Sequence, residues 1–243
     1  MYIIGSVLII PAIIFALVAQ ARVSGAFSRY SQIPSSTGMT GAQLARKILD
    51  GNNCNHVTVE KGHGHLTDHY DPRTKKVVLS DDVFGSTSLA ALGVAAHECG
   101  HAIQHQTHYA PLMLRQIVIR YTGFISKLLM PLILISIIAS IFVVNTTIMG
   151  MSSERFWFIL IVLFCAIYGV SFLINVITLP TEYNASSRAK SILRNILHDD
   201  EEREAVSRVL GAAALTYVAS LLISAVYFLR FLGLLLLMTG RRR

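Results

Sequence analysis

The sequence is poor in charged residues and in cysteine, and both shortages limit what the protein can be. Only 14% of its 243 residues are Asp, Glu, Lys or Arg, 53% are hydrophobic, and the mean hydropathy is +0.55. Soluble domains carry about 25% charged residues, so much of the chain is expected in lipid. The three cysteines have no paired spacing, which argues against a disulfide framework or a cysteine zinc knuckle. They favour reduced thiols and a cytosolic catalytic part.

The sequence also lacks the pattern of a nucleic-acid-binding protein, although its net charge is +7. Its basic residues lie beside apolar runs and are not interleaved with aromatic residues. Contact with an anionic membrane surface explains this charge more simply. There is no internal repeat and no low-complexity segment. The expected partner is therefore a lipid bilayer and not a nucleic acid.

Long uncharged runs predict about four transmembrane helices. Residues 1–21 hold an apolar run long enough to cross a bilayer. No basic segment precedes it and no clear cleavage site follows it, which favours a retained helix over a signal peptide. Residues 128–181 hold two further runs, 128–153 and 156–181, separated by one Glu-Arg pair. They predict a transmembrane helical pair whose two ends lie on the same side.

The last apolar stretch and the basic residues bear on orientation. Residues 209–238 are expected to form a transmembrane segment, or a hairpin if Arg230 interrupts it, followed by a basic tail at 239–243. Most Lys and Arg near the ends of the runs lie on the side of residues 22–127. Because cytosolic loops carry an excess of basic residues, we expect this side to face the cytosol. The basic tail opposes this orientation if the last stretch crosses once.

Residues 22–127 have the composition of a globular domain, expected to be mainly α with a small β-hairpin or sheet. Thr40 is expected to cap a helix that ends near Gly51. Short strands are predicted at 57–59, 66–70 and 76–79. The last two form a hairpin whose edge could hold an extended peptide by strand addition. Residues 182–208 are expected to add a cytosolic helical region.

One segment carries the strongest chemical signal, His97-Glu98-x-x-His101. On a helix this spacing puts two imidazoles on one face, one turn apart, with a carboxylate beside them. The pattern is typical of a zinc site whose general base is the glutamate. Fourteen uncharged residues precede the motif, too few for a membrane span, so we predict a buried core helix. Cys99 is expected to serve packing, and His105 to lie at the surface or behind a zinc ligand.

A catalytic zinc ion needs three protein ligands and one open position, so two histidines are incomplete. A third histidine is absent from the position that extended zinc motifs use. Among the acids that follow, elimination leaves Glu182, which lies on the side of His97. The alternative is that Glu182 caps a helix that starts after Pro180. The ligand interpretation predicts one Zn²⁺ per chain, bound by His97, His101 and Glu182, with Glu98 as the base.

A second polar cluster lies in the predicted hairpin. Strand alternation would put His63, His65 and His69 on one face. These residues could be solvated, could contact substrate or an oxyanion, or could bind a second metal ion, and solvated residues are favoured. The candidates for oxyanion contact are His69, Tyr70 and Tyr183.

The chain resembles the YugP-like membrane neutral zinc metallopeptidases of bacteria. The resemblance rests on Thr40-Gly-Ala-Gln-Leu-Ala, Leu66-Thr-Asp-His-Tyr-Asp-Pro-Arg73, Ala95-Ala-His-Glu-Cys-Gly-His-Ala-Ile-Gln104 and Leu179-Pro-Thr-Glu-Tyr-Asn-Ala-Ser186. It implies a multi-pass protein of the bacterial plasma (inner) membrane. The arrangement is also similar to that of HtpX-like membrane gluzincins, which implies an α+β gluzincin-like zinc peptidase core. Those enzymes carry an acid four residues after the zinc-binding glutamate, where this chain has Ser186.

These observations predict a zinc endopeptidase that cleaves polypeptides, membrane proteins among them, at the cytosolic membrane surface, with protein quality control as a candidate role. A membrane chaperone or scaffold with a structural, non-cleaving zinc site is the alternative. An open ligand position speaks against it, because structural zinc sites are usually closed by four protein ligands. A transporter has less support, since the predicted spans carry almost no ionisable residue.

Overall fold

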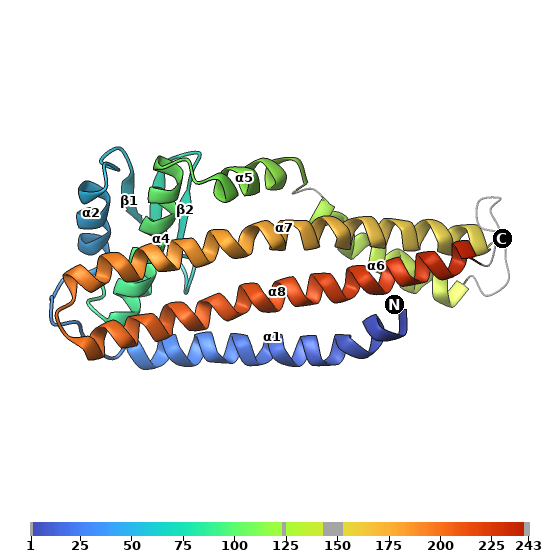
Figure 1. Cartoon of the computed structure of the whole chain (residues 1–243), viewed down its shortest axis with the longest axis horizontal. Coiled ribbons are helices and arrows are strands. Elements are labelled where there is room, and N and C mark those ends of the chain that lie inside the picture. The colour runs from blue at the N-terminus through green and yellow to red at the C-terminus, as the bar shows by residue number, and fades with distance from the viewer. Residues whose placement is uncertain (1, 123–124, 143–152, 241–243) are drawn as a thin grey trace. The chain divides into compact units, whose positions relative to one another are not determined.

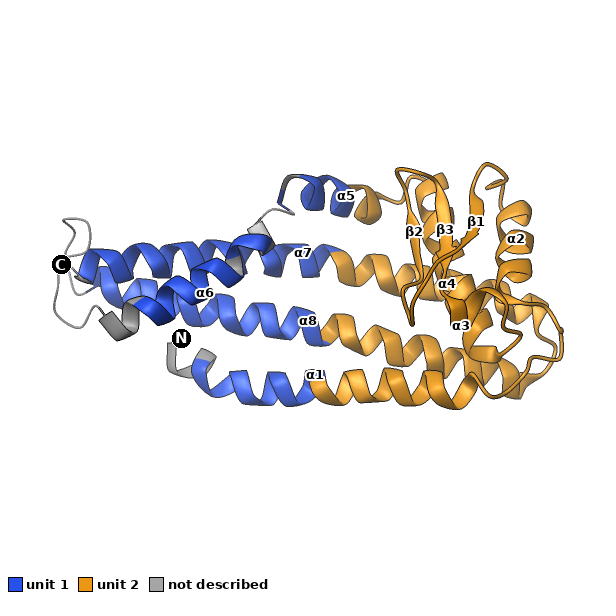
Figure 2. Cartoon of the chain, turned by 180° about the vertical axis from the view of Figure 1, so that it is seen from behind, with its two compact units in different colours: residues 1–16, 114–177, 219–243 blue, residues 17–113, 178–218 orange. Residues whose placement is uncertain are grey.

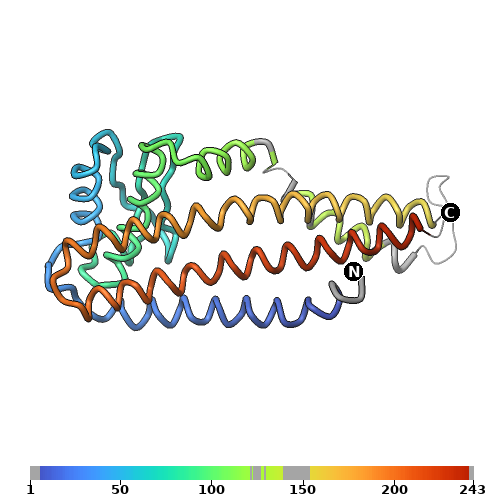
Figure 3. The backbone as a smooth tube through the Cα atoms, viewed as in Figure 1, coloured from blue at the N-terminus to red at the C-terminus, as the bar shows by residue number. Residues whose placement is uncertain are grey.

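Helices make up most of the computed structural model, which describes residues 2–122, 125–142 and 153–240 (Figure 1). The expected class, mainly α with a small sheet, is confirmed. The helices are α1 (Tyr2–Tyr30), α2 (Gly41–Gly51), α3 (Asp81–Phe84), α4 (Leu89–Gln106), α5 (Ala110–Thr122), α6 (Ile125–Phe142), α7 (Ser153–Ile196) and α8 (Asp200–Gly240). The strands are β1 (Thr58–Lys61), β2 (His69–Asp71) and β3 (Lys76–Leu79). Figure 3 shows the reversal between α7 and α8 at residues 197–199.

Among the described residues, three helices are long and apolar enough to cross a membrane. They are Ser6–Tyr30 of α1, Glu154–Ile196 of α7 and Asp200–Gly240 of α8. The prediction of about four transmembrane helices is therefore confirmed only in part. The predicted run at 128–153 lies partly outside the described residues, and α6 covers the part up to Phe142. α8 continues without interruption past Arg230, so a hairpin at that residue is not observed.

The chain divides into two compact units (Figure 2). Unit 1 comprises Met1–Ala16, Leu114–Ile177 and Ala219–Arg243. Within it, aromatic rings stack between α7 and α8. The pairs are Phe164 with Phe231, Tyr168 with Tyr227 and Phe172 with Phe228, at centroid distances of 4.9, 4.8 and 6.0 Å. These apolar contacts hold the two helices side by side in unit 1.

Unit 2 comprises Leu17–Met113 and Thr178–Val218 and contains the sheet. β2 and β3 pair antiparallel, as the hairpin prediction required, with His69 opposite Val78. β1 pairs with β3 in parallel, which was not predicted, and the strand order is β1-β3-β2. The expectation that three histidines share a strand face is wrong. His63 and His65 lie in the loop between β1 and β2, and only His69 is in a strand.

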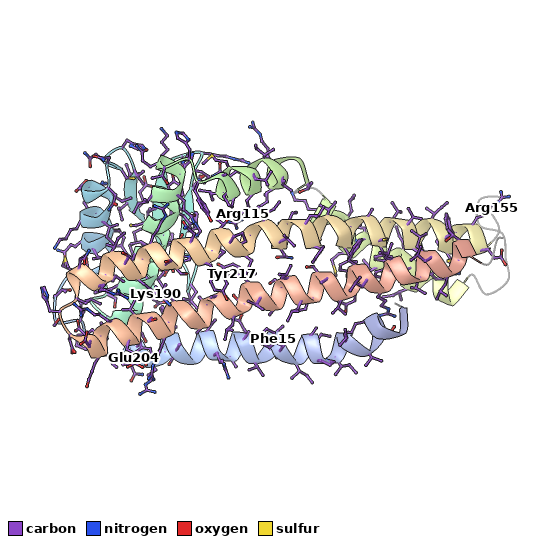
Figure 4. All side chains as sticks on the ribbon, in the orientation of Figure 1. Phe15, Arg115, Arg155, Lys190, Glu204 and Tyr217 are labelled. Carbon is purple, nitrogen blue, oxygen red and sulfur yellow. The ribbon has the colours of Figure 1, made fainter. Side chains whose placement is uncertain are left out.

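α4 lies at the centre of the core of unit 2. Most of its side chains are buried, including Leu92, and α2 packs against it through Leu44 and Leu49. α2 begins as predicted at Thr40, which forms a reciprocal capping box with Gln43. Figure 4 shows charged side chains such as Lys190 on the part of α7 that belongs to unit 2. The motif helix is thus a core helix and not a membrane crossing, as expected.

Candidate metal centre

α4 and α7 cross closely at Gly100, between the two histidines of the motif. A Cβ atom at position 100 would lie 2.7 Å from the carbonyl oxygen of Ala185, closer than any real contact of this kind. Only glycine fits this approach, and the residue that faces it on α7 has only a methyl side chain. The crossing brings Glu182, on the same helix as Ala185, to the motif face of α4.

Three potential metal ligands converge at this crossing. The Nε2 atoms of His97 and His101 lie 3.2 and 3.3 Å from the same oxygen of Glu182, Oε2. One ligand atom from each of the three residues lies within 4.8 Å of the others. Ligands at zinc bond lengths of about 2.0–2.1 Å in tetrahedral geometry are about 3.3 Å apart. The donor set of two nitrogens and one oxygen, and its spacing, therefore fit a zinc ion.

Gln104 fixes the orientation of the His101 ring. Its amide nitrogen donates hydrogen bonds to the carbonyl oxygen of Thr181 at 2.7 Å and to Asn184 Oδ1 at 3.0 Å. The amide oxygen is left to accept a hydrogen bond from His101 Nδ1 at 3.0 Å. A proton on Nδ1 leaves Nε2 as the acceptor nitrogen, turned toward Glu182. This is the tautomer that a metal ligand requires.

Ser186 gives His97 the equivalent support. Its hydroxyl oxygen lies 3.1 Å from His97 Nδ1 and can accept the ring proton, which again leaves Nε2 for a metal. Ser186 lies one helical turn after Glu182. In this chain a hydroxyl therefore contacts the imidazole from the position four residues after Glu182.

Buried carboxylates set the charge of the centre. Glu182 is 2% exposed and His101 is 8% exposed. Burial opposes a positive charge on His101, but its hydrogen bond to Glu182 and the attraction of Glu98 and Glu182 outweigh burial and raise the pKa of His101. The centre therefore attracts positive charge, either a proton or a metal cation.

Glu98 lies beside the ligands with an uncommitted carboxylate. The residue is 8% exposed, and its carboxylate forms no hydrogen bond or ion pair with another residue in the described ranges. Buried carboxylates are usually paired. A carboxylate without a protein partner, next to a metal site, has the free acceptor capacity that a general base needs.

Of the remaining site predictions, the structure brings none into the ligand cluster. His69 is exposed, with Nδ1 2.8 Å from the Thr67 carbonyl oxygen, and Tyr183 is 50% exposed. The hydroxyl of Tyr70 lies 2.8 Å from His105 Nδ1. Burial, followed by the charges of Cys54 and Asp71, raises the pKa of Tyr70 to about 12. Their proposed contact with an oxyanion stays a prediction.

The capping role considered for Glu182 is not observed, because α7 is continuous from Ser153 to Ile196 and no helix starts after Pro180. Sequence reasoning missed Gln104 and did not foresee the contact of Ser186. Helical spacing could have paired Gln104 with His101, which lies three residues before it on the same helix, but the contact of Ser186 is with His97 on another helix and no local pattern specifies it. The free cysteine Cys99 is fully buried, as the packing prediction required.

Comparisons with known proteins point to the same chemistry. Residues 5–236, a range that includes the whole centre, match the protein family described as "Putative neutral zinc metallopeptidase". A curated protein of Bacillus subtilis (strain 168), "Putative membrane protease YugP", is 39% identical over 231 residues. The alignment covers 94% of this chain and 95% of that protein. No solved structure matches the chain.

Proposed function

Because the chain belongs to this family of neutral zinc metallopeptidases, we propose that it is a membrane endopeptidase of the gluzincin type. His97, His101 and Glu182 bind one Zn²⁺ in this proposal, and Glu98 is the general base. The observation that carries it is the convergence of two imidazole nitrogens on one buried carboxylate oxygen, at 3.2 and 3.3 Å.

The side chains of the centre support peptide hydrolysis. Zinc, when bound, supplies a Lewis acid that polarises the peptide carbonyl and lowers the pKa of the attacking water. Glu98 accepts a proton from that water on a carboxylate oxygen and then donates it to the nitrogen of the leaving amine. Ser186 and Gln104 hold the two imidazole rings in place meanwhile.

The sheet supports a polypeptide as the substrate. β2 is an edge strand of the sheet, and it packs against α4 (Figure 1). An extended peptide can add to such an edge through main-chain hydrogen bonds, which do not depend on its sequence. The edge strand next to the motif helix would align the peptide backbone near the zinc ligands.

The membrane surface is the proposed place of action. α7 carries both an apolar run long enough to cross a membrane and the ligand Glu182. The excess of basic residues on the side of residues 22–127 favours the cytosolic face. Membrane proteins with segments at this surface are the proposed substrates, and their quality control is the proposed role.

The alternative, a scaffold with a structural zinc site, has less support. Within the described ranges, the only group of three or more His, Cys, Asp or Glu residues placed to hold a metal ion is the set of three at the crossing. Structural zinc sites usually have four protein ligands, and catalytic sites have three.

The decisive experiment compares Glu98→Gln with wild type and with the surface control Glu201→Gln, each as the full chain loaded with zinc. Cleavage of casein or of a membrane-protein substrate, with a chelator control, is the readout. We expect Glu98→Gln to keep its zinc and to lose activity by about 100-fold or more, while Glu201→Gln retains it. Unchanged proteolysis in Glu98→Gln would refute the assigned base. Full zinc occupancy in Glu182→Ala would refute the third ligand.

A further inference from the structure

Unit 2 contains a second feature that the metal centre does not use, a pocket of about 200 Å³ with a basic lining. It is formed by the segment before β1, by β2 and the turn after it, and by the C-terminal half of α4 with the residues that follow. Its walls include four basic side chains and one phenol, those of His56, Lys75, His105, His108 and Tyr70.

No acidic residue lines this basic pocket. The carboxylate of Asp71, next to Tyr70, is occupied by its own turn and accepts hydrogen bonds from Arg73 N at 2.9 Å and Thr74 Oγ1 at 2.8 Å. The carbonyl oxygen of Lys75 accepts a hydrogen bond from Thr58 N at 3.2 Å, but its ammonium group forms no hydrogen bond or ion pair with any residue that the structure describes. The lining therefore offers the positive charge of Lys75 and the hydrogen-bonding nitrogens of three imidazoles, with no acidic residue among them, which favours an anionic ligand.

The basic residues of the pocket lie close enough to affect the pKa of His105, one of their number. Burial lowers the pKa of His105, and the charges of Lys75, His108 and His56 lower it further. Two of these residues also have a left-handed backbone, with φ of +55° at Lys75 and +51° at His108. Glycine or asparagine is favoured at such positions, because the Cβ atom of other residues strains a left-handed backbone. The chain thus keeps basic side chains at positions where glycine would be less strained.

The position of the basic pocket on α4 relates it to the proposed base. Glu98, Ala102 and His105 follow each other at helical spacings of four and three residues and so share one face of α4. Ala102 and His105 line the pocket, which begins about 6 Å and extends to about 10 Å along the helix from Glu98. An extended peptide covers this distance in about two to three residues.

We propose that the basic pocket binds a carboxylate of the peptide substrate, two or three residues from the bond that is cleaved. This assignment rests on the proposed peptidase function and adds a substrate class to it. The carboxylate is either an Asp or Glu side chain or the free C terminus of the substrate. In a peptide added to the β2 edge, the residue opposite Tyr70 points to the same face of the sheet as Tyr70. That face is the one on which Tyr70 reaches His105.

The test uses the full-length, zinc-loaded protein and a series of quenched fluorescent peptides that carry Glu or Gln two or three residues from the cleaved bond, on either side. Each peptide is made with a free and with an amidated C terminus, which distinguishes the two sources of the carboxylate. We expect one acidic position, or the free terminus, to raise kcat/KM by about fivefold to tenfold, mainly through KM.

Variants at the turn test the pocket itself. Lys75→Gln removes the positive charge but keeps a long, non-glycine side chain at this left-handed position, so it should abolish the preference for the acidic peptide. Lys75→Glu should reverse the preference toward basic peptides. Lys47→Gln, which removes an exposed charge from α2, should keep the wild-type preference.

The outcomes separate the pocket from the peptidase function. Equal cleavage of the acidic and neutral peptides by the wild type, with Glu98→Gln inactive, overturns the pocket assignment alone. Peptide binding to zinc-loaded Glu98→Gln is measured in parallel, so the assignment is tested even if no peptide is cleaved, and equal affinities overturn it. If anionic vesicles stimulate the wild type but not Lys75→Gln, and the peptides are cleaved alike, the pocket binds a lipid headgroup instead.

Discussion

Replacing Gly100 with alanine is the most direct test of how the metal centre is assembled. The added Cβ atom would lie 2.7 Å from the Ala185 carbonyl oxygen, about 0.7 Å short of an ordinary 3.4 Å contact. The obstructing atom belongs to a helix backbone, so α4 and α7 must separate by a similar amount. Zinc sites tolerate changes of only about 0.2 Å in ligand distances.

The expected loss can be estimated from this displacement. We expect the zinc affinity of Gly100→Ala to fall by at least tenfold to 100-fold, the range measured when contacts that orient the ligands are removed. The free energy of unfolding should change less. Overpacking costs about 1–3 kcal/mol, but alanine regains about 1 kcal/mol of helix propensity.

Gly93→Ala provides a matched control on the same helix. Its Cβ atom would meet Val206 Cγ1 at 3.3 Å, so a side-chain methyl group and not a helix backbone would have to shift, by only a few tenths of an ångström. Zinc affinity is measured by competition with a chromophoric chelator at pH 7, and stability by thermal unfolding. Wild-type zinc affinity in Gly100→Ala would refute the close crossing of α4 and α7.

Three further predictions concern the groups around the centre. Ser186→Ala should lower zinc affinity by about tenfold to 100-fold through the freed ring of His97, with unchanged thermal stability as the control for folding; unaltered affinity would show that the hydroxyl is dispensable. Zinc titrations at several pH values should show affinity falling by up to tenfold per unit below the raised pKa of His101, because the proton must leave before the metal binds; affinity independent of pH down to 5 would contradict this. Tyr70→Phe should lower the free energy of unfolding by about 1 kcal/mol, because the hydrogen bond with His105 is lost. It should change kcat on neutral peptides little. A 100-fold loss of kcat would instead assign the Tyr70 hydroxyl to contact with the oxyanion.

The sequence predicted those parts of the molecule that depend on local spacing. The helix cap at Thr40, the β2–β3 hairpin and the burial of the motif helix follow from neighbouring residues, and the structure confirms them. Glu182 was selected by elimination, without knowledge of the path of α7, and the structure now places it beside both histidines.

The features that were missed depend on contacts between distant segments. The parallel pairing of β1 with β3 joins strands that the hairpin does not connect, and no local pattern specifies it. Gln104 lies on the motif helix, but its role depends on Thr181 and Asn184 of α7. The histidines were misplaced because the chain leaves β1 before His63, so the alternation of a strand does not apply to them.

The buried carboxylate of Glu182 explains why the hydrogen bonds that hold the His97 and His101 rings matter to the protein without its metal. A carboxylate as enclosed as that of Glu182 is costly unless positive charge and hydrogen bonds compensate it. When a chelator removes the metal, a proton on His101 can supply that charge, as the direction of its pKa shift shows. The zinc-bound centre and the metal-free, protonated centre use the same positions of the two imidazole rings, which Gln104 and Ser186 hold. The fold around α4 is therefore expected to persist without zinc, so that metal loss affects activity before it affects the core.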